Sequence, residues 1–132
     1  MAGASGAQRQ EDMARQEIDY TELLDVDGLR RDCEAILKRG SMKLLEMRAA
    51  LLPLFRRASN EGRDKARELL ARDGSGLNCA ERISWVQDQL IAAIYETVTK
   101  HLYKTAAEKV AVTAVGGYGR GTLAPGSDID LL

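Results

Sequence analysis

The sequence predicts an α+β fold, in which a helical region over residues 21–106 is followed by the first two strands of a sheet within residues 107–132. Two observations support this class. Apolar residues recur at helical spacing through most of the chain, and a short β-branched run begins near residue 109. Residues 1–20 are small and polar in character and lack an apolar core, so a disordered tail is expected there.

The first helix is predicted over residues 27–38. Its apolar residues Leu29, Cys33, Ile36 and Leu37 recur at i, i+4, i+7 and i+8, which places them on one helical face. Because glycine is costly inside a helix, Gly40 is a natural end for this element or a strained interior position.

A second helix is expected over residues 42–57, with a kink or short break at Pro53 because proline lacks a backbone donor and clashes with the preceding turn. Residues 59–62 have turn composition, and a short charged helix is expected over residues 63–72. Residues 73–76 then form a loop.

The longest helix is expected to begin at Asn78, a capping residue with Glu81 three positions later. Its apolar stripe runs from Ile83 to Leu102. Core packing explains such a stripe more simply than docking of a partner or cofactor. His101, the only histidine, is expected near the helix end and has no second metal ligand at i+4.

The residue composition changes at residue 109. Residues 110–115 are almost wholly apolar and predict a strand buried on both faces. Residues 116–126 form a loop with five of the twelve glycines, in which no helix plainly begins, and residues 128–132 predict a second strand. Because a natural domain rarely stops on a buried strand, we expect the chain to be a fragment of a longer protein.

The composition gives no support for a nucleic-acid-binding or membrane-spanning protein. The net charge is −1 and the aromatic content is 5%, so nothing in bulk favours a nucleic acid or an acidic membrane surface as partner. No apolar run approaches the roughly 20 residues of a membrane span, and a cytoplasmic location is expected. Cys33 and Cys79 form no paired motif. Buried free thiols are the simpler interpretation, with a disulfide or redox role as the alternative.

Asp128 and Asp130 are the first chemical feature. Strand side chains alternate, so these two carboxylates share one face while Ile129 and Leu131 point into the core. Carboxylates about 4 Å apart repel by roughly 4 kcal/mol at an effective dielectric of about 20. A cation between them, or protonation of one, relieves this repulsion. A hard cation with oxygen ligands fits best, and Mg²⁺ commonly takes one or two carboxylates plus substrate phosphates.

The glycine-rich loop is the second feature. Gly116 and Gly117 allow a close approach of backbone amides to phosphate oxygens, Arg120 adds a guanidinium suited to phosphate, and Ser127 adds a hydroxyl beside the aspartates. Glycine-rich loops are usually only turns, and Asp-x-Asp is common. The joint pattern is far more specific, and it predicts in-line attack on an α-phosphate with loss of pyrophosphate.

Other phosphate and metal motifs do not fit the same segment. Gly-Lys-Ser/Thr is missing, which excludes a P-loop. The glycine spacing does not give G-x-G-x-x-G, which makes a Rossmann site a weak alternative. The glycine and bidentate glutamate of an EF-hand are missing at the required spacing.

The segment from Ala114 to Leu132 resembles the nucleotidyltransferase superfamily of polymerase β type. Its runs Gly-Gly-Tyr-Gly-Arg-Gly and Leu-x-Pro-x-Ser-Asp-Ile-Asp-Leu-Leu look closest to those of the bacterial PII uridylyltransferase/uridylyl-removing enzymes. The strong likeness covers about the last twenty residues. It implies that the two predicted strands open a nucleotidyltransferase sheet that is truncated in this chain.

The resemblance also implies residue roles and a reaction. Gly116 and Gly117 match the nucleotide-phosphate glycines, and Asp128 and Asp130 match the metal-binding, catalytic aspartates. The implied reaction transfers UMP from UTP to a tyrosine of the PII nitrogen-signalling protein, with Mg²⁺. Full-length members also carry an HD hydrolase domain and ACT domains. A third carboxylate lies on a later strand, so this fragment alone is expected to be inactive.

Two alternatives stay open at this point. The first keeps the chemistry and changes the substrate, as in a glutamine synthetase adenylyltransferase, because the base preference is not encoded in the motif. The second is a helical interaction module without catalysis, because most of the chain is amphipathic helix.

Overall fold

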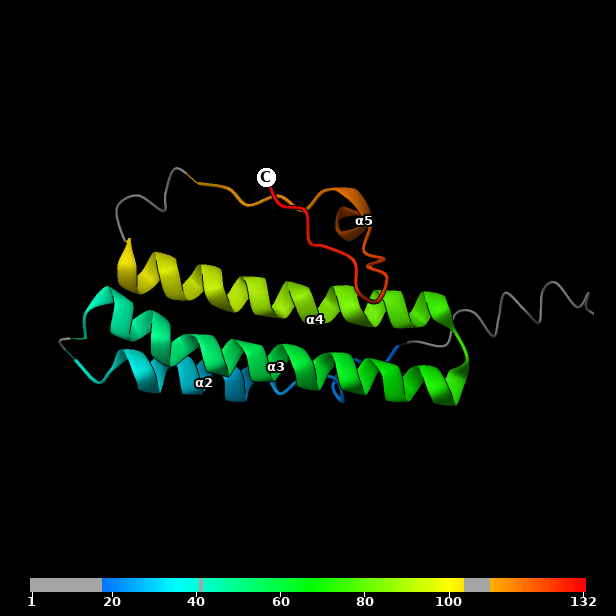
Figure 1. Ribbon diagram of the computed structural model, residues 1–132, viewed down its shortest axis with the longest axis horizontal. Coiled ribbons are helices and arrows are strands. Elements are labelled where there is room, and N and C mark those ends of the chain that lie inside the picture. The colour runs from blue at the N-terminus through cyan, green and yellow to red at the C-terminus, as the bar shows by residue number, and fades with distance from the viewer. Residues whose placement is uncertain (1–17, 41, 104–109) are drawn as a thin grey trace, which may run out of the picture.

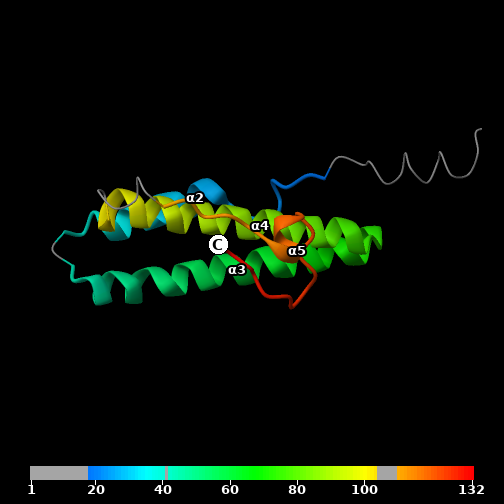
Figure 2. The same cartoon turned by 90° about the horizontal axis from the view of Figure 1, so that it is seen from above.

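The computed structural model describes residues 18–40, 42–103 and 110–132. Three helices, α2 (Val26–Leu37), α3 (Leu44–Asp73) and α4 (Gly76–Thr97), lie side by side along the long axis of the molecule (Figure 1). The chain continues from α4 into the π-helix η1 (Val98–Leu102). Residues 110–132 then run over α4 and carry the short helix α5 (Gly116–Gly119) (Figure 2).

The first predicted helix is confirmed as α2. Asp25 caps it by accepting a 2.8 Å hydrogen bond from the N–H of Gly28, and Leu29 and Cys33 are its buried residues. Both cysteines, Cys33 and Cys79, are buried free thiols, as expected. Burial raises the pKa of each thiol, which keeps both protonated and unreactive.

The division of the next segment into two helices was wrong. A single helix, α3, runs from Leu44 to Asp73 and continues through Pro53 and through the expected turn at 59–62. Gly62 explains the error, because it is buried where α3 meets α4. A Cβ at this position would lie 2.6 Å from Cγ1 of Val86. The glycine therefore allows two helices to approach closely and does not mark a turn.

The long helix is confirmed, but its start was misplaced. Ser75 caps α4 by accepting a 3.2 Å hydrogen bond from the N–H of Asn78. The side chain of Asn78 instead donates to Asp73 at the end of α3, over 3.4 Å. The cap therefore forms three residues earlier than expected, where the serine follows the left-handed Gly74 (φ 66°) that ends α3.

The core lies between the three long helices, under α5 and its loop. Val86 is fully buried in the middle of α4, and Leu123 of the loop is 1% exposed. His101 lies in η1 at the end of the long helix, as expected. The buried hydrophobic residues are Leu23, Leu29, Cys33, Leu51, Leu54, Ala58, Ala66, Cys79, Ile83, Val86, Leu90, Ala93, Tyr118 and Leu123.

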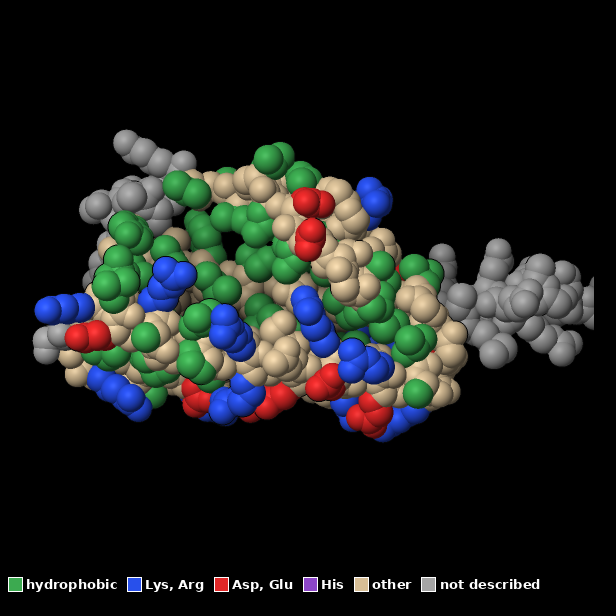
Figure 3. Space-filling view, viewed as in Figure 1, with side chains coloured by type: hydrophobic (Ala, Val, Ile, Leu, Met, Phe, Trp, Pro, Cys, Tyr) green, Lys and Arg blue, Asp and Glu red, His purple; other side chains and the backbone are tan. Residues whose placement is uncertain are grey.

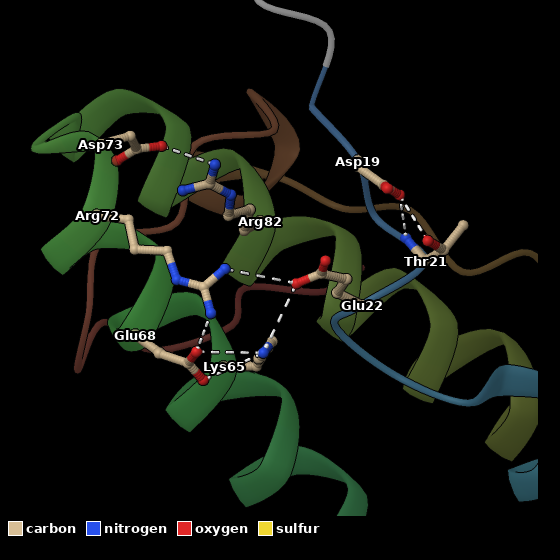
Figure 4. Close-up of polar contacts among 8 residues, drawn as sticks. All are labelled: Asp19, Thr21, Glu22, Lys65, Glu68, Arg72, Asp73 and Arg82. Atoms are coloured by element: carbon tan, nitrogen blue, oxygen red, sulfur yellow. Dashed lines mark hydrogen bonds and ion pairs between the residues drawn. The ribbon is translucent and has the colours of Figure 1, made fainter.

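The end of α3 is tied to α4 by an ion pair in which the arginine is buried and the aspartate lies at the surface. Arg82 of α4, whose side chain is 9% exposed, lies 2.7 Å from the Asp73 carboxylate (Figure 4). Burial of Asp73 opposes its ionisation, but hydrogen bonds from Arg82, Ser75 and Asn78 outweigh that effect and lower its pKa. Removing Asp73 is expected to be costly, because the buried guanidinium would be left without its partner.

The segment before α2 packs on the bundle. Glu22 lies 3.6 Å from Lys65 and 3.9 Å from Arg72, both on α3 (Figure 4). The ring of Tyr20 stacks on Trp85 of α4 with centroids 5.3 Å apart. The tail expected over residues 1–20 therefore does not extend to Tyr20, and residues 1–17 lie outside the described part of the chain.

The two expected strands are reduced to one antiparallel bridge, between Ala114 and Leu131, and no longer strand occurs within the described residues. Thr113 and Leu132 exchange backbone hydrogen bonds of 2.7 and 2.9 Å, so the expected segments do pair. The prediction that residues 110–115 are buried on both faces was wrong. Val110 and Val112 are 57% and 45% exposed, because one side of this segment faces the open cavity above α4.

Within the described ranges, we find no helix that combines the length and the apolar character needed to cross a bilayer.

Candidate functional site

The predicted phosphate loop begins with a helical turn, which the sequence did not suggest. Helix α5 starts at Gly116, whose φ of 62° lies in the left-handed region that favours glycine. The turn closes through a 2.8 Å hydrogen bond from the N–H of Gly119 to the carbonyl of Val115. A Cβ on Gly119 would lie 2.6 Å from the Ala114 carbonyl oxygen, so this position also requires glycine.

Gly116 and Asp130 meet in the structure. A Cβ at position 116 would lie only 2.6 Å from Oδ2 of Asp130, so the carboxylate occupies the space that a side chain would fill. The backbone brings them together, since the N–H of Val115 donates to the carbonyl of Asp130 over 3.1 Å. A predicted nucleotide-binding glycine and a predicted metal ligand are therefore direct neighbours.

The alternation expected around the aspartates is confirmed in part. Asp128 and Asp130 are exposed, while Ile129 between them packs against the core. Leu131 was expected in the core and is 44% exposed instead. It lines the cavity above α4, because the described residues on that side do not close over it.

Arg120 lies beside the second glycine. Its Nη2 atom is 3.8 Å from the position that a Cβ on Gly117 would take. A Cβ there would make only an ordinary van der Waals contact with the guanidinium, which lies against the start of α5. The structure therefore groups Gly116, Gly117, Arg120 and Asp130, which the sequence analysis had singled out separately.

Ser127 lies on a different side of the loop. Residues 124–127 form a β-turn with Pro125 and the left-handed Gly126 (φ 80°) in its middle, closed by a 3.0 Å hydrogen bond from the N–H of Ser127 to the carbonyl of Ala124. Ser127 is exposed and lines a cavity against α3. Its role as a hydroxyl donor beside the aspartates stays a prediction.

Helix α4 fixes both ends of the glycine loop, and the sequence analysis missed the residues that do so. The hydroxyl of Tyr118, which is 4% exposed, donates to Asp88 over 2.5 Å. The buried N–H of Leu123 donates to the hydroxyl of Ser84 over 2.8 Å. Ser84 and Asp88 are one helical turn apart, a spacing that could have indicated a polar stripe inside an otherwise apolar face.

The environment of Tyr118 favours its protonated form. Burial raises the pKa of its phenol, and the hydrogen bond and negative charge of Asp88 raise it further. The phenol is therefore held in the protonated form that donates to Asp88.

Asp128 and Asp130 provide hard oxygen ligands of the kind that Mg²⁺ uses. The described ranges contain no cluster of three or more acidic, cysteine or histidine side chains suited to a metal. Two exposed carboxylates beside a glycine turn still fit this ion, because phosphate oxygens and water commonly complete its coordination.

A large apolar cavity lies apart from these residues. It measures about 450 Å³ and opens between α4 and the C-terminal segment, where Figure 3 shows a hollow lined by apolar side chains. Its walls include Ile94, Tyr95, Val110, Val112 and Leu131. None of the predicted site residues lines it, so its size does not identify it as a catalytic site.

Comparison with known proteins first indicates the class of domain to which the C-terminal part of the chain is similar. Residues 94–132, which include the end of α4 and all the predicted site residues, match the nucleotidyltransferase domain family. Among individual proteins, the chain is 41% identical over 112 residues to the bifunctional uridylyltransferase/uridylyl-removing enzyme of Bradyrhizobium sp. (strain BTAi1 / ATCC BAA-1182). The resemblance to this group of enzymes is therefore confirmed.

The alignment with the Bradyrhizobium enzyme covers 82% of this chain and 12% of the relative. The likeness thus extends well beyond the glycine loop into the helical region. No solved structure matches the chain.

Proposed function

We propose that this chain forms part of a uridylyltransferase that transfers UMP from UTP to a tyrosine of the PII nitrogen-signalling protein and releases pyrophosphate. The contact between Gly116 and Asp130 is the observation that carries the proposal. It joins the glycine turn suited to phosphate with a carboxylate suited to Mg²⁺. The named relative supports the uridylyl group as the one transferred.

The reaction needs few groups from the protein. The tyrosine oxygen of the acceptor attacks the α-phosphorus of UTP and forms a new O–P bond. The bond from that phosphorus to the bridging oxygen breaks, pyrophosphate leaves with the electron pair, and the phenolic proton is lost to solvent or a base. Such a displacement depends mainly on positioning and on neutralising negative charge.

The residues around α5 supply both requirements in this proposal. The first N–H groups of a helix have no acceptor inside it, and those of Gly116 and Gly117 are suited to phosphate oxygens. The Arg120 guanidinium beside Gly117 adds positive charge. Asp128 and Asp130 would hold Mg²⁺, which supplies further neutralisation of the phosphates when bound.

We propose further that the complete protein is bifunctional, also removes UMP, and acts in the cytoplasm, where UTP is available. The chain spans 12% of the length of its Bradyrhizobium relative. We therefore expect transfer to require the full-length protein, with a third carboxylate supplied outside the residues described above.

The test is transfer of α-labelled UMP from UTP to purified PII by the full-length protein with Mg²⁺. We expect labelling that chelation of the metal abolishes, and loss of labelling in Asp128→Asn and Asp130→Asn. Asp27→Asn, an exposed aspartate on α2, is the matched control and should label normally. Undiminished labelling in both site variants would overturn the proposal.

Donor choice separates the proposal from an adenylyltransferase. The same assay with labelled ATP should give no transfer to PII. Efficient transfer from ATP, or transfer only to a different acceptor such as glutamine synthetase, would replace UTP and PII while keeping the site.

A further inference from the structure

A second cavity lies on the other side of the loop that leads to Asp128. It measures about 390 Å³ and opens between α3 and the turn at residues 124–127, with a floor of apolar residues from both long helices. This volume is within the range of about 300 to 1,000 Å³ that is usual for small-molecule sites. The residues that line it are Arg63, Arg67, Leu70, Cys79, Ile83, Leu123, Ala124, Pro125, Gly126 and Ser127.

Two arginines form its basic wall. Arg63 and Arg67 are one helical turn apart on α3, so their side chains leave the helix on the same face. Within the described residues, Arg63 takes part in none of the ion pairs. Arg67 lies 2.9 Å from Asp64, but both side chains are more than 70% exposed. Such a pair is weak and leaves the guanidinium available.

The opposite wall leads directly to the candidate metal ligands. Ser127 lines the cavity, and Asp128 is the next residue. The turn at 124–127 is fixed by its internal hydrogen bond and by the buried Leu123, whose N–H is held by Ser84. Figure 3 shows acidic side chains on the segment above α4, Lys and Arg side chains on the same face below it, and further acidic side chains along the lower edge.

These observations favour an anionic ligand. Arginine is always charged, and its planar fork donates two parallel hydrogen bonds to phosphate oxygens. Ser127 lines the same cavity, and a serine hydroxyl can act as a further donor. An acidic ligand held there would lie one residue from Asp128, where the phosphates of a nucleotide are expected.

We infer that Arg63 and Arg67, together with Ser127, form a subsite for the phosphate groups of the nucleotide substrate. This inference rests on the proposed function, because it extends the same site from the glycine turn across the loop to α3. It assigns a nucleotide-binding role to the helical region, which the family motif does not include.

The experiment measures binding of inorganic tripolyphosphate to the full-length protein by calorimetry, with a chelator present so that the aspartates cannot contribute through a metal. We expect the double variant Arg63→Gln/Arg67→Gln to weaken binding at least about tenfold. Arg56→Gln/Arg48→Gln removes two other arginines of α3 that do not line the cavity and is the matched control. It should bind as the unchanged chain does.

Two further results bear on the assignment. Weakening by the double variant should shrink as salt rises, because the lost contacts are ionic. Equal binding by the double variant and the control would overturn the inference, as would a double variant of the full-length protein that binds UTP normally and loses only its affinity for the acceptor. Tripolyphosphate binding needs neither base nor acceptor, so failure of the uridylyl assay would leave this measurement intact.

Discussion

The carboxylate of Asp130 occupies the space beside Gly116 that a side chain would need, with Oδ2 only 2.6 Å from the position of a Cβ. Gly116 also adopts a φ of 62°, which favours glycine, so a side chain added there would strain the backbone and displace the carboxylate. The contact joins the start of α5 to the segment that carries both aspartates. Any change at position 116 should therefore act on the metal ligand as well as on the turn.

Gly116→Ala should abolish nucleotide transfer by the full-length protein. The added methyl displaces the Asp130 carboxylate, and the left-handed backbone costs a further 1–2 kcal/mol or so. Gly121→Ala is the matched control, because Gly121 has a similar φ of 72° but open space around a Cβ. It should lose some stability and keep its response to Mg²⁺. Equal loss of transfer in both variants would show that backbone strain alone matters.

Tyr118 and Asp88 should be energetically coupled. The hydroxyl of Tyr118 is buried and donates to Asp88 over 2.5 Å, a charge-assisted hydrogen bond. Tyr118→Phe and Asp88→Asn should each destabilise the chain, and a double-mutant cycle in urea should give a coupling of about 1 kcal/mol or more. Tyr103→Phe, at a tyrosine that is 52% exposed, should be neutral. A coupling near zero would mean that the hydrogen bond contributes nothing.

The raised pKa of Tyr118 predicts a specific loss of stability at high pH. In the unfolded chain this phenol ionises near its ordinary value of about 10, whereas burial and Asp88 keep it protonated in the fold. The folded state then binds the extra proton, so stability falls as pH rises above that value. Tyr118→Phe should flatten this part of the curve, measured by urea unfolding at pH 9 to 11. An identical slope in the variant would contradict the assignment.

Four of the residues singled out from the sequence lie close together in the structure, and their roles in nucleotide and metal binding stay predictions. Gly116, Gly117, Arg120 and Asp130 come together because the loop is short and its glycines impose the local backbone. The hydrogen bonds from Leu123 to Ser84 and from Tyr118 to Asp88 were not predicted, since they join residues 39 and 30 positions apart. Local spacing carries no information on such contacts.

Two other differences between the sequence prediction and the structure also arise from contacts between distant residues. Val110 and Val112 have the composition of a buried strand, but burial depends on what covers them, and they border an open cavity. Gly62 has the composition of a turn, but its role is set by Val86, 24 residues away on the next helix. In both cases the tertiary neighbour, and not the local propensity, decided the structure.

Gly62→Ala should destabilise the bundle, although alanine is the better helix former by about 1 kcal/mol. The new methyl would lie 2.6 Å from Cγ1 and 2.9 Å from Cγ2 of Val86, a stiff β-branched side chain that cannot rotate away from both contacts. Overpacking of this kind costs about 1–3 kcal/mol, which exceeds the gain in propensity. Urea unfolding should therefore show a net loss of stability.

A variant of Val86 tests whether its contact with position 62 is the cause of this loss of stability. Val86→Ala alone should leave a cavity and destabilise the chain. The double variant Gly62→Ala/Val86→Ala should be more stable than the sum of the two single effects predicts, because truncation of Val86 removes the clash and the methyl at position 62 fills part of the cavity. Gly76→Ala, at the open first position of α4, is the control and should be neutral or stabilising. Strict additivity in the double variant would place the cost of Gly62→Ala somewhere other than the α3–α4 contact.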